Sequence, residues 1–332
     1  MNTFGNFLRF SIFGESHGRS VGIVIGGSPA GVPLCEDDLL ADLNRRQSGK
    51  TGTTPRKEAD LPKIISGTYN GKTTGAPITV LFENTDTRSK DYSRFTEVPR
   101  PGHADFTASI KYGGHSDFRG GGHFSGRLTL GLVSAGVLAK KLISPMLVSA
   151  VLVEAGGDTD IEAAVEKAVE EEDSIGGIIE CTATRVPVGL GEPFFGSVES
   201  QIAQMAFSIP AIKGIEFGAG FNAAKMTGSR HNDNFISVQG QTETNHAGGI
   251  NGGISNGNDI VFRVAVKPTS STSRPQETIN MKTGKQTVLK VEGRHDTCIA
   301  LRVPVVLEAA TAMVLADLSM AAQGIERIFA ET

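Results

Sequence analysis

The chain has 332 residues, of which 39% are hydrophobic and 20% are charged, and its formal net charge is −4. This composition is typical of a soluble globular protein, and it excludes a collagen-like fibre, a membrane span and an overall basic surface for nucleic acid. Three widely spaced cysteines without a C-x-x-C pair, and an N-terminus without a signal-peptide pattern, favour a reducing cytoplasm over a disulfide framework or a structural zinc.

The first predicted elements are two strands, residues 7–13 and 20–25, which are rich in β-branched and aromatic side chains. A glycine-flanked turn between them presents His17 at the end of a sheet, although an ordinary hairpin loop would have the same sequence. Residues 36–46 then predict a helix, because three leucines share one face and acidic residues occupy the first turn. This helix carries Arg46 at its C-terminal end.

A basic loop follows the helix and contains Lys50, Arg56 and Lys57. The loop either meets an anion or is simply solvated, which is the usual outcome for a run of charge. Two further strands are predicted at 63–68 and 77–82, around an Asn-Gly turn.

Residues 100–127 combine three of the seven histidines with four cationic side chains and seven glycines. Glycine lets the backbone approach a ligand, arginine binds carboxylate and phosphate, and histidine exchanges protons near neutral pH. The segment therefore predicts a site for an anionic small molecule that undergoes proton transfer; the alternative is a solvated polar loop. A short helix is expected at 104–112 and a buried, largely apolar helix at 126–143, whose N-terminus follows the glycines.

The second half begins with alternating elements: a strand at 148–153, a helix at 159–172, a strand at 176–188 and a helix at 197–207. We expect a capping box between Thr159 and Glu162 at the start of the first of these helices. The order predicts a split βαβ arrangement packed in layers. A G-x-G-x-x-A sequence at 218–223 resembles a dinucleotide-binding turn only loosely, because a polar loop follows it where a second strand would be needed.

Three more polar clusters come later in the chain, at 245–253, at 267–273 after a predicted strand at 259–266, and at 293–296. Lys267 is followed by several hydroxyl side chains, which suit either a phosphate receptor or a flexible linker. A long apolar core helix is predicted at 300–322. Since no linker or change in composition divides the chain, we expect one catalytic domain over 1–332 that gathers these clusters into one basic cleft.

Six ordered motifs resemble the chorismate synthase family over nearly the whole chain: G-E-S-H-G at 14–18, R-P-G-H-A-D at 100–105, D-F-R-G-G-G at 117–122, N-H-A-G-G at 245–249, K-P-T-S-S at 267–271 and G-R-H-D at 293–296. The resemblance implies an α+β fold, a layered β-α-β sandwich with helices buried between sheets, and a homotetramer. It implies a lyase that removes phosphate and a ring proton from 5-enolpyruvylshikimate 3-phosphate to give chorismate. It also implies reduced FMN, with either NADPH or an external flavin reductase as the source of electrons.

The same resemblance implies roles for individual residues. His17 resembles the acid that assists phosphate departure, His103 the proton partner of the reduced flavin, and Asp296 the carboxylate that helps to take the ring proton. The implied substrate receptors are Ser16, Arg46, Arg56, Arg100, Arg127 and Arg294. The implied flavin contacts are His123, Phe124, Ser125, Pro210, Ala211, Gly252, Lys267, Pro268, Thr269, Ser270, Ser271 and Arg294.

The chain departs from the family pattern at His123 and Phe124, where the family usually has arginine and serine, and at Lys50, near which it often has an arginine. Three other function classes compete with the lyase. A non-catalytic flavin- or phosphosugar-binding relative would lack His17, His103 or Asp296, and all three are present. An NADPH-dependent flavin oxidoreductase would need a genuine dinucleotide fold, and a metal hydrolase would need a motif such as H-E-x-x-H, which is absent.

Overall fold

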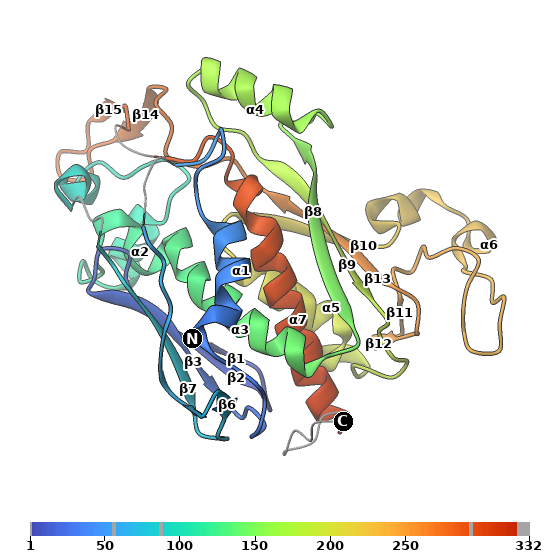
Figure 1. The fold of residues 1–332 in the computed structure, drawn as a ribbon. Coiled ribbons are helices and arrows are strands. Elements are labelled where there is room, and N and C mark those ends of the chain that lie inside the picture. Colours follow the sequence, from blue (N-terminus) through green and yellow to red (C-terminus); the bar gives the residue numbers. More distant parts are fainter. Residues whose placement is uncertain (1, 55–57, 86–88, 292–294, 324–332) are drawn as a thin grey trace.

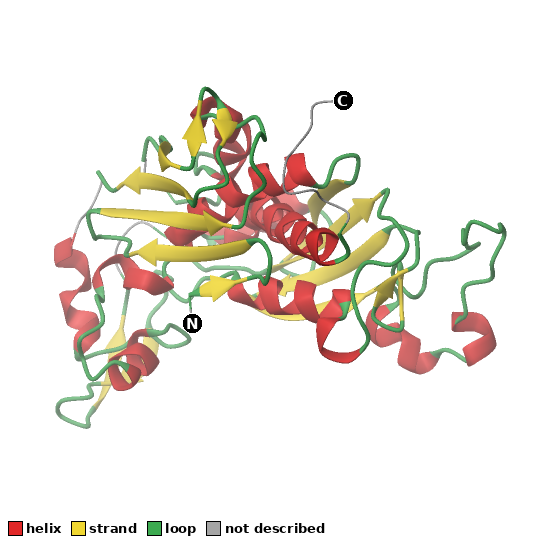
Figure 2. Cartoon of the chain, turned by 90° about the horizontal axis from the view of Figure 1, so that it is seen from below, coloured by secondary structure: helices red, strands yellow, loops and turns green. Residues whose placement is uncertain are grey.

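The computed structural model describes residues 2–54, 58–85, 89–291 and 295–323. Two antiparallel sheets enclose a double layer of helices, as Figure 1 shows and the second view in Figure 2 also shows. This arrangement confirms the predicted α+β sandwich with helices buried between sheets.

The first sheet has the strand order β1-β2-β3-β7-β4. Its strands are β1 (Thr3–Phe4), β2 (Arg9–Gly14), β3 (Ser20–Gly26), β7 (Ile78–Glu83) and β4 (Lys63–Ser66). Alternate side chains on β3 and β7 are buried because only one face of the sheet meets the helices. Gly14 pairs with Val21, so residues 15–19 form the turn that leaves the end of the sheet.

The predicted Asn70-Gly71 turn is present, but it joins different strands from those expected. Both residues have positive φ, and they connect the short strands β5 (Thr68–Tyr69) and β6 (Lys72–Thr73). The longer strands β4 and β7 instead pair directly with each other. The sequence pattern identified the turn correctly but could not show how far its two arms extend.

The second sheet has the order β10-β13-β9-β8. Its strands are β10 (Ile212–Phe217), β13 (Ile260–Val266), β9 (Gly177–Thr184) and β8 (Leu147–Ala155). Strand β13 is antiparallel to both β9 and β10, so these two strands run parallel with β13 between them. Helix α5 (Val198–Ser208) connects β9 to β10, which confirms the split βαβ unit.

Four helices fill the space between the sheets. Helices α1 (Glu36–Arg46) and α3 (Thr129–Leu142) lie on the side of the first sheet, whereas α5 and α7 (Val303–Ala321) lie on the side of the second (Figure 1). Helices α3 and α7 approach closely at Gly136, where an added Cβ would lie 2.2 Å from the Cβ of Ala309. The segment Ile299–Ala321 is long and apolar enough to cross a membrane, but most of it is buried in this core.

Shorter elements surround the sandwich. They are α2 (Asp105–Lys111), α4 (Ile161–Glu170), α6 (Gly228–His231), the strand pairs β11 (Ile250–Asn251) with β12 (Ile254–Ser255) and β14 (Gln276–Ile279) with β15 (Gln286–Leu289), and the 3₁₀ segments η1 (Ser89–Thr96), η2 (Arg119–Phe124), η3 (Gly126–Leu128), η4 (Phe194–Gly196), η5 (Gly220–Lys225) and η6 (Ile299–Arg302).

Two local predictions are corrected by these elements. Helix α4 is capped by Asp160, whose side chain accepts a hydrogen bond from the Ala163 N–H, so the capping box expected at Thr159 was wrong by one residue. Residues 218–223 lead from β10 into η5 and the projecting segment that carries α6 (Figure 2). No helix packs back onto the sheet there, so the dinucleotide-binding alternative has no structural basis.

Candidate active site

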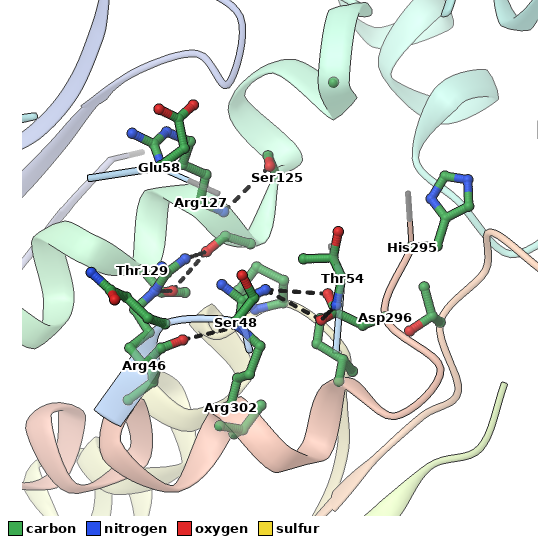
Figure 3. Close-up of a pocket in the computed structure, with 18 of the residues that line it drawn as sticks. Arg46, Ser48, Thr54, Glu58, Ser125, Arg127, Thr129, His295, Asp296 and Arg302 are labelled. Carbon is green, nitrogen blue, oxygen red and sulfur yellow. Dashed lines mark hydrogen bonds and ion pairs between the residues drawn. The ribbon is translucent and has the colours of Figure 1, made fainter. Parts of the chain in front are cut away.

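A cavity of about 480 Å³ opens where the helix layer meets the loops of the predicted polar clusters. This volume lies within the roughly 300–1,000 Å³ typical of small-molecule sites. Its charged lining consists of four arginines and three carboxylates, namely Arg46, Arg100, Arg127, Arg302, Glu58, Asp60 and Asp296. Figure 3 labels five of them: Arg46, Arg127, Arg302, Glu58 and Asp296. Positive groups therefore exceed negative groups by one, which suits an anionic ligand.

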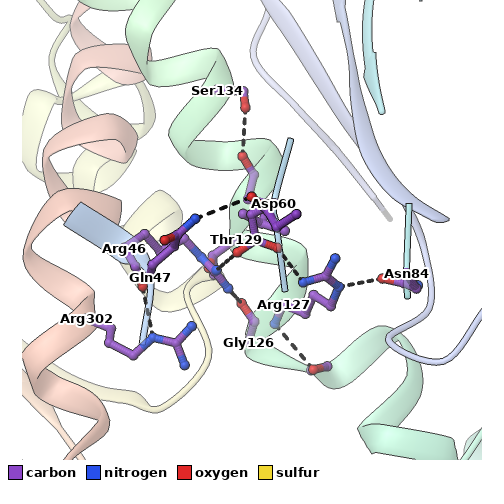
Figure 4. A network of polar contacts seen from close by, with 12 residues as sticks. Arg46, Gln47, Asp60, Asn84, Gly126, Arg127, Thr129, Ser134 and Arg302 are labelled. Atoms are coloured by element: carbon purple, nitrogen blue, oxygen red, sulfur yellow. Dashed lines mark hydrogen bonds and ion pairs between the residues drawn. The ribbon is translucent and has the colours of Figure 1, made fainter. Parts of the chain in front are cut away.

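Arg46 and Arg127 form one wall of the cavity, on either side of Asp60 (Figure 4). Arg46 donates from Nε to the Thr129 hydroxyl at 2.7 Å and from Nη2 to the Gly126 carbonyl at 2.8 Å. Arg127 donates from Nη1 to Asp60 at 2.7 Å and from Nε to the Asn84 side chain. These bonds orient both guanidinium groups before any ligand arrives.

The electrostatics of this wall favour an added anion. Burial lowers the pKa of Arg46 to about 9, with the charges of Arg302 and Arg127 contributing in the same direction and Asp60 opposing them. Arg46 therefore stays charged at neutral pH, but its charge is only partly compensated by the protein. A phosphate or carboxylate in the cavity would supply the missing compensation.

His17 lies in the turn between β2 and β3, where the end of the hairpin carries it to the edge of the cavity. It is only 8% exposed, and its ring meets Tyr92 edge-on with 5.1 Å between ring centroids. A Cβ on Gly120, whose φ is +61°, would lie 2.6 Å from His17 Nε2. Only a glycine with this left-handed backbone allows the cavity wall to approach the imidazole so closely.

His103 lies against the next glycine, Gly121, and contacts Arg100, which lines the cavity. A Cβ on Gly121 would be 3.6 Å from His103 Nε2. The other ring nitrogen, Nδ1, is 2.6 Å from Asp105 Oδ1, which therefore accepts its proton and turns Nε2 toward the glycines. Two histidines that are distant in the sequence thus lie against adjacent glycines, and each contacts a residue that lines the cavity.

Arg100 and Asp105 hold His103 in place. Arg100 donates from Nε and Nη2 to the two carboxylate oxygens of Asp105, both at 2.8 Å, and from Nη1 to the Ser271 hydroxyl at 3.0 Å. Burial alone would raise the pKa of Asp105, but hydrogen bonds from Arg100 and His103 outweigh it and hold the pKa below the usual value. Asp105 is thus a charged, buried orienting group for the imidazole.

Asp296 lines the opposite part of the cavity (Figure 3). Its Oδ1 accepts the backbone N–H of Thr54 at 2.9 Å, and Arg302 Nη1 is 3.3 Å from both carboxylate oxygens. Arg302 also donates from Nε to the Arg46 carbonyl at 3.0 Å. The carboxylate and the arginine wall are therefore connected through Arg302.

Several of the predicted flavin contacts cluster beside the cavity. Ser125, Pro210 and Thr269 line it directly. The backbone of Ala211 has a positive φ of 76°, and its carbonyl accepts the Lys267 N–H at 2.9 Å, which ties the end of β13 to the residues before β10. A non-glycine residue in this conformation is strained, and such strain is concentrated at ligand sites.

The segment Lys267–Ser271, which includes Pro268, reaches across to the His103 loop. Lys267 Nζ donates to the Ser270 hydroxyl at 2.7 Å, and that hydroxyl donates to the Gly102 carbonyl at 2.7 Å. Burial and the nearby charge of Lys213 both lower the pKa of Lys267. A phosphate beside this lysine would favour its charged form.

Other predicted residues lie apart from this cluster or have structural partners. His123 binds the Gly14 carbonyl through Nδ1 at 2.8 Å, and Phe124 is 39% exposed beside Tyr112. Gly252 lies near the N-terminal end of α5, because the carbonyl of its neighbour Gly253 accepts the first N–H of that helix. The cavity lies at the C-terminal end of α5. The helix of 11 residues, roughly 16 Å long, separates Gly252 from the cavity.

Arg56 and Arg294 lie outside the described residues, so their predicted roles stay predictions. Ser16, a predicted substrate contact, is fully buried, and its N–H donates to the Gly122 carbonyl at 3.1 Å. Within the described part of the chain, no group of three or more histidine, cysteine or acidic side chains is arranged to hold a metal ion.

The residues of the site that were not predicted include Asp60, Tyr92, Asp105, Thr129 and Arg302. Asp105 had a detectable signal, because it lies two residues after His103 in a cationic, glycine-rich segment. The other four reach the site from elements whose sequences read as ordinary loop or core. Only the three-dimensional arrangement brings them together.

Comparisons with known proteins agree with this geometry. The family model described as chorismate synthase matches residues 8–320. A chorismate synthase of Chitinophaga pinensis is 61% identical over 330 residues, which cover 99% of each chain, and one of Korarchaeum cryptofilum is 43% identical over 346 residues, which cover 95% of this chain and 96% of the relative. A crystal structure of chorismate synthase superposes with a TM-score of 0.74 at 27% identity, covering 97% of this chain and 94% of the other.

Proposed function

Since the chain belongs to the chorismate synthase family, and so converts 5-enolpyruvylshikimate 3-phosphate to chorismate as a carbon–oxygen lyase, we propose which of its residues carry out that reaction. One observation carries the proposal: His17 and His103 lie against the adjacent glycines Gly120 and Gly121, and Gly120 lines a cavity that also contains four arginines. The substrate has two carboxylates and a phosphate, and the cavity offers receptors for them. Arg46 and Arg127 bind the anionic groups, with Arg100 and Ser16 nearby and Arg56 and Arg294 as further candidates.

His17 donates a proton to the departing phosphate from Nε2, the nitrogen that faces the cavity wall at Gly120. A histidine is suited to this step because its ordinary pKa of about 6.5 leaves a usable protonated fraction at neutral pH. Burial between Tyr92 and the glycine wall keeps the ring in one orientation. The proton is therefore delivered at a fixed position as the C–O bond breaks.

The ring proton leaves toward Asp296. Its Oδ1 accepts the Thr54 N–H, so we assign Oδ2 as the proton acceptor, and Arg302, 3.3 Å from both oxygens, orients the carboxylate. His103, oriented by Asp105, holds a proton on Nδ1, and its Nε2, which lies 3.1 Å from Arg100 Nη2, would exchange a proton with a bound cofactor. Three titratable groups on separate loops thus each take part in a different proton transfer.

The family requires a reduced flavin, and we propose that this chain binds FMN with the residues beside the cavity: Ser125, Pro210, Ala211 and Lys267–Ser271. The lowered pKa of Lys267 and the strained backbone of Ala211 support this fit, because an anionic, planar ligand would use both. The chemistry that reduced FMN supplies when bound is electron density toward the substrate ring as the allylic phosphate departs. His123, Phe124 and Gly252 are weaker candidates, since the first is engaged with Gly14 and the last lies beyond α5.

Association and cellular context also belong to the proposal. We propose a homotetramer, supported by strongly exposed aromatic side chains such as Phe194, Phe195 and Phe221, which are more than four-fifths exposed in the single chain. We propose a cytoplasmic enzyme, which fits its three free cysteines. The electrons for the flavin come from NADPH or an external flavin reductase.

The test is anaerobic turnover with photoreduced FMN. His17→Ala and His103→Ala should each lower the rate of phosphate release by about 10²–10⁴, with an unchanged circular dichroism spectrum. His231→Ala, on α6 away from the cavity, is the matched control and should retain full activity. Near-normal phosphate release by either cavity variant would contradict the assigned roles. Repeating the assay with NADPH and oxidised FMN identifies the electron source.

A further inference from the structure

A small hydrophobic cluster lies apart from the main core and beside the cavity. It consists of Phe95, Leu289 and Val291, which are 4%, 0% and 1% exposed, with Tyr92 and Val98 packed against it. We call this cluster the satellite core. It joins η1 to the end of β15, from which the chain continues toward Asp296. Segments that carry site residues thus share a hydrophobic anchor of their own.

Phe95 lies between two chains of contacts that end at the two histidines. On one side, the Tyr92 ring meets Phe95 with 6.0 Å between centroids and 70° between planes. Tyr92 in turn meets His17 at 5.1 Å and 86°. Edge-to-face contacts of this kind depend on the orientation of both rings, so the position of Phe95 constrains that of His17 through Tyr92.

On the other side, the guanidinium carbon of Arg100 lies 4.4 Å from the centre of the Phe95 ring. This distance is well inside the roughly 6 Å limit for a cation–π contact. Arg100 binds both oxygens of Asp105, and its Nη2 lies 3.1 Å from His103 Nε2. The face of Phe95 therefore supports the arginine that sets the position of His103.

We propose that Phe95 is a positioning residue that couples His17 to His103 through Tyr92 on one side and Arg100 on the other. Phe95 does not line the cavity, and its ring contacts are with Tyr92 and Arg100. An aromatic ring is required because the two contacts use different features of it: Tyr92 meets the ring in an edge-on arrangement, and Arg100 lies over the negative face. A leucine would fill the satellite core but provide neither feature.

The alternative is that Phe95 only fills space, as a buried side chain usually does. In that case Phe95→Leu would lower the thermal midpoint and leave the histidines unchanged. Phe262→Leu is the matched control, because Phe262 is equally buried, 1% exposed, but lies in β13 within the main core. Both variants lose the same atoms, so a difference between them at the histidines reports position and not volume.

The experiment labels histidine with ¹³C and ¹⁵N and follows the ring signals of His17, His103 and the remote His231 at one pH. In Phe95→Leu, the His17 and His103 signals should both shift while His231 stays constant. In Phe262→Leu, all three signals should keep their positions. Unchanged His17 and His103 signals in folded Phe95→Leu would overturn the proposal.

A second variant separates the two contact chains and also serves if Phe95→Leu does not fold. Tyr92→Leu should shift the His17 signal and leave that of His103 in place; equal shifts of both, or of neither, would overturn the coupling. In turnover, kcat of Phe95→Leu should fall about tenfold or more, since misplacement of about 1 Å can cost up to roughly 100-fold, with KM little changed. The kinetic measurement depends on the proposed catalytic roles of the histidines, whereas the ring signals do not. Shifted ring signals with unchanged kcat would therefore contradict the catalytic roles, and unchanged ring signals would contradict the positioning role of Phe95.

Discussion

Asp105 provides the sharpest test of how the site is oriented. Its buried carboxylate, with a side chain only 6% exposed, accepts two hydrogen bonds from the Arg100 side chain, one from the Arg100 N–H and one from His103 Nδ1. Asp105→Asn keeps the shape but removes the charge and replaces one acceptor by an NH₂ group. That group must then face a donor on Arg100 or on His103.

The expected cost follows from these contacts. Leaving a buried charged partner uncompensated costs about 3–5 kcal/mol of unfolding free energy; we expect about 3 kcal/mol, because asparagine retains one acceptor oxygen. Loss of the Nδ1 acceptor also frees His103 to adopt the other tautomer, and in related carboxylate–histidine pairs the analogous change lowers turnover by up to about 10⁴. We expect a decrease of at least 10² in kcat for Asp105→Asn.

The stability difference should depend on pH in a defined direction. The folded pKa of Asp105 is depressed below its ordinary value of 3.8, so its contribution is fully present above that pH and is lost as the pH falls through the folded pKa. Titration of the Asp105 carboxyl itself should therefore add no pH dependence to the difference between wild type and Asp105→Asn from pH 5 to pH 8. The difference should shrink only below about pH 4.

The assay pairs denaturant unfolding with anaerobic turnover, and Asp317→Asn is the control. Asp317 is also buried, and it accepts the backbone N–H groups of Asn6, Phe7 and Leu8 far from the cavity. It should lose stability on the same scale without losing kcat in the folded enzyme. The reasoning would be refuted if Asp105→Asn kept normal turnover, or if both variants lost activity only in proportion to the unfolded fraction.

Two further predictions follow from glycine geometry and thiol burial. Gly120→Ala should displace the His17 ring, because the new Cβ would lie 2.5 Å from its Cδ2, and should lower turnover by about 10². The control is Gly71→Ala, where φ is similarly positive but the new Cβ would meet open space. This control should lose about 1 kcal/mol of unfolding free energy and no activity. Burial raises the pKa of the Cys181 thiol to about 12. A thiol reagent at pH 8 should therefore modify the exposed Cys35 in the native enzyme, and Cys181 only after unfolding. Rapid labelling of Cys181 in the native enzyme would contradict this prediction.

Much of the local structure could be predicted from the sequence. The helix expected at 36–46 has those same bounds, and the strands expected at 20–25 and 259–266 differ from the observed ones by a single residue at one end. Such elements are predictable because the spacing of hydrophobic residues within one short segment distinguishes a helix from a strand. Where the expectation failed, as at the cap of α4, two adjacent polar residues competed and local geometry decided between them.

The sequence by itself also determined the family and which chemical groups are available, because ordered motifs of histidine, arginine and glycine occur within single short segments. Only the tertiary structure decided that His17 and His103 lie against adjacent glycines, that Asp60 lies between Arg46 and Arg127, and that Phe95 lies between Tyr92 and Arg100. Most of these contacts join segments that are distant in the chain, so no run of consecutive residues specifies them. The periodicity of hydrophobic residues shows which face of a helix or strand is buried, but it does not show which distant residues that face contacts.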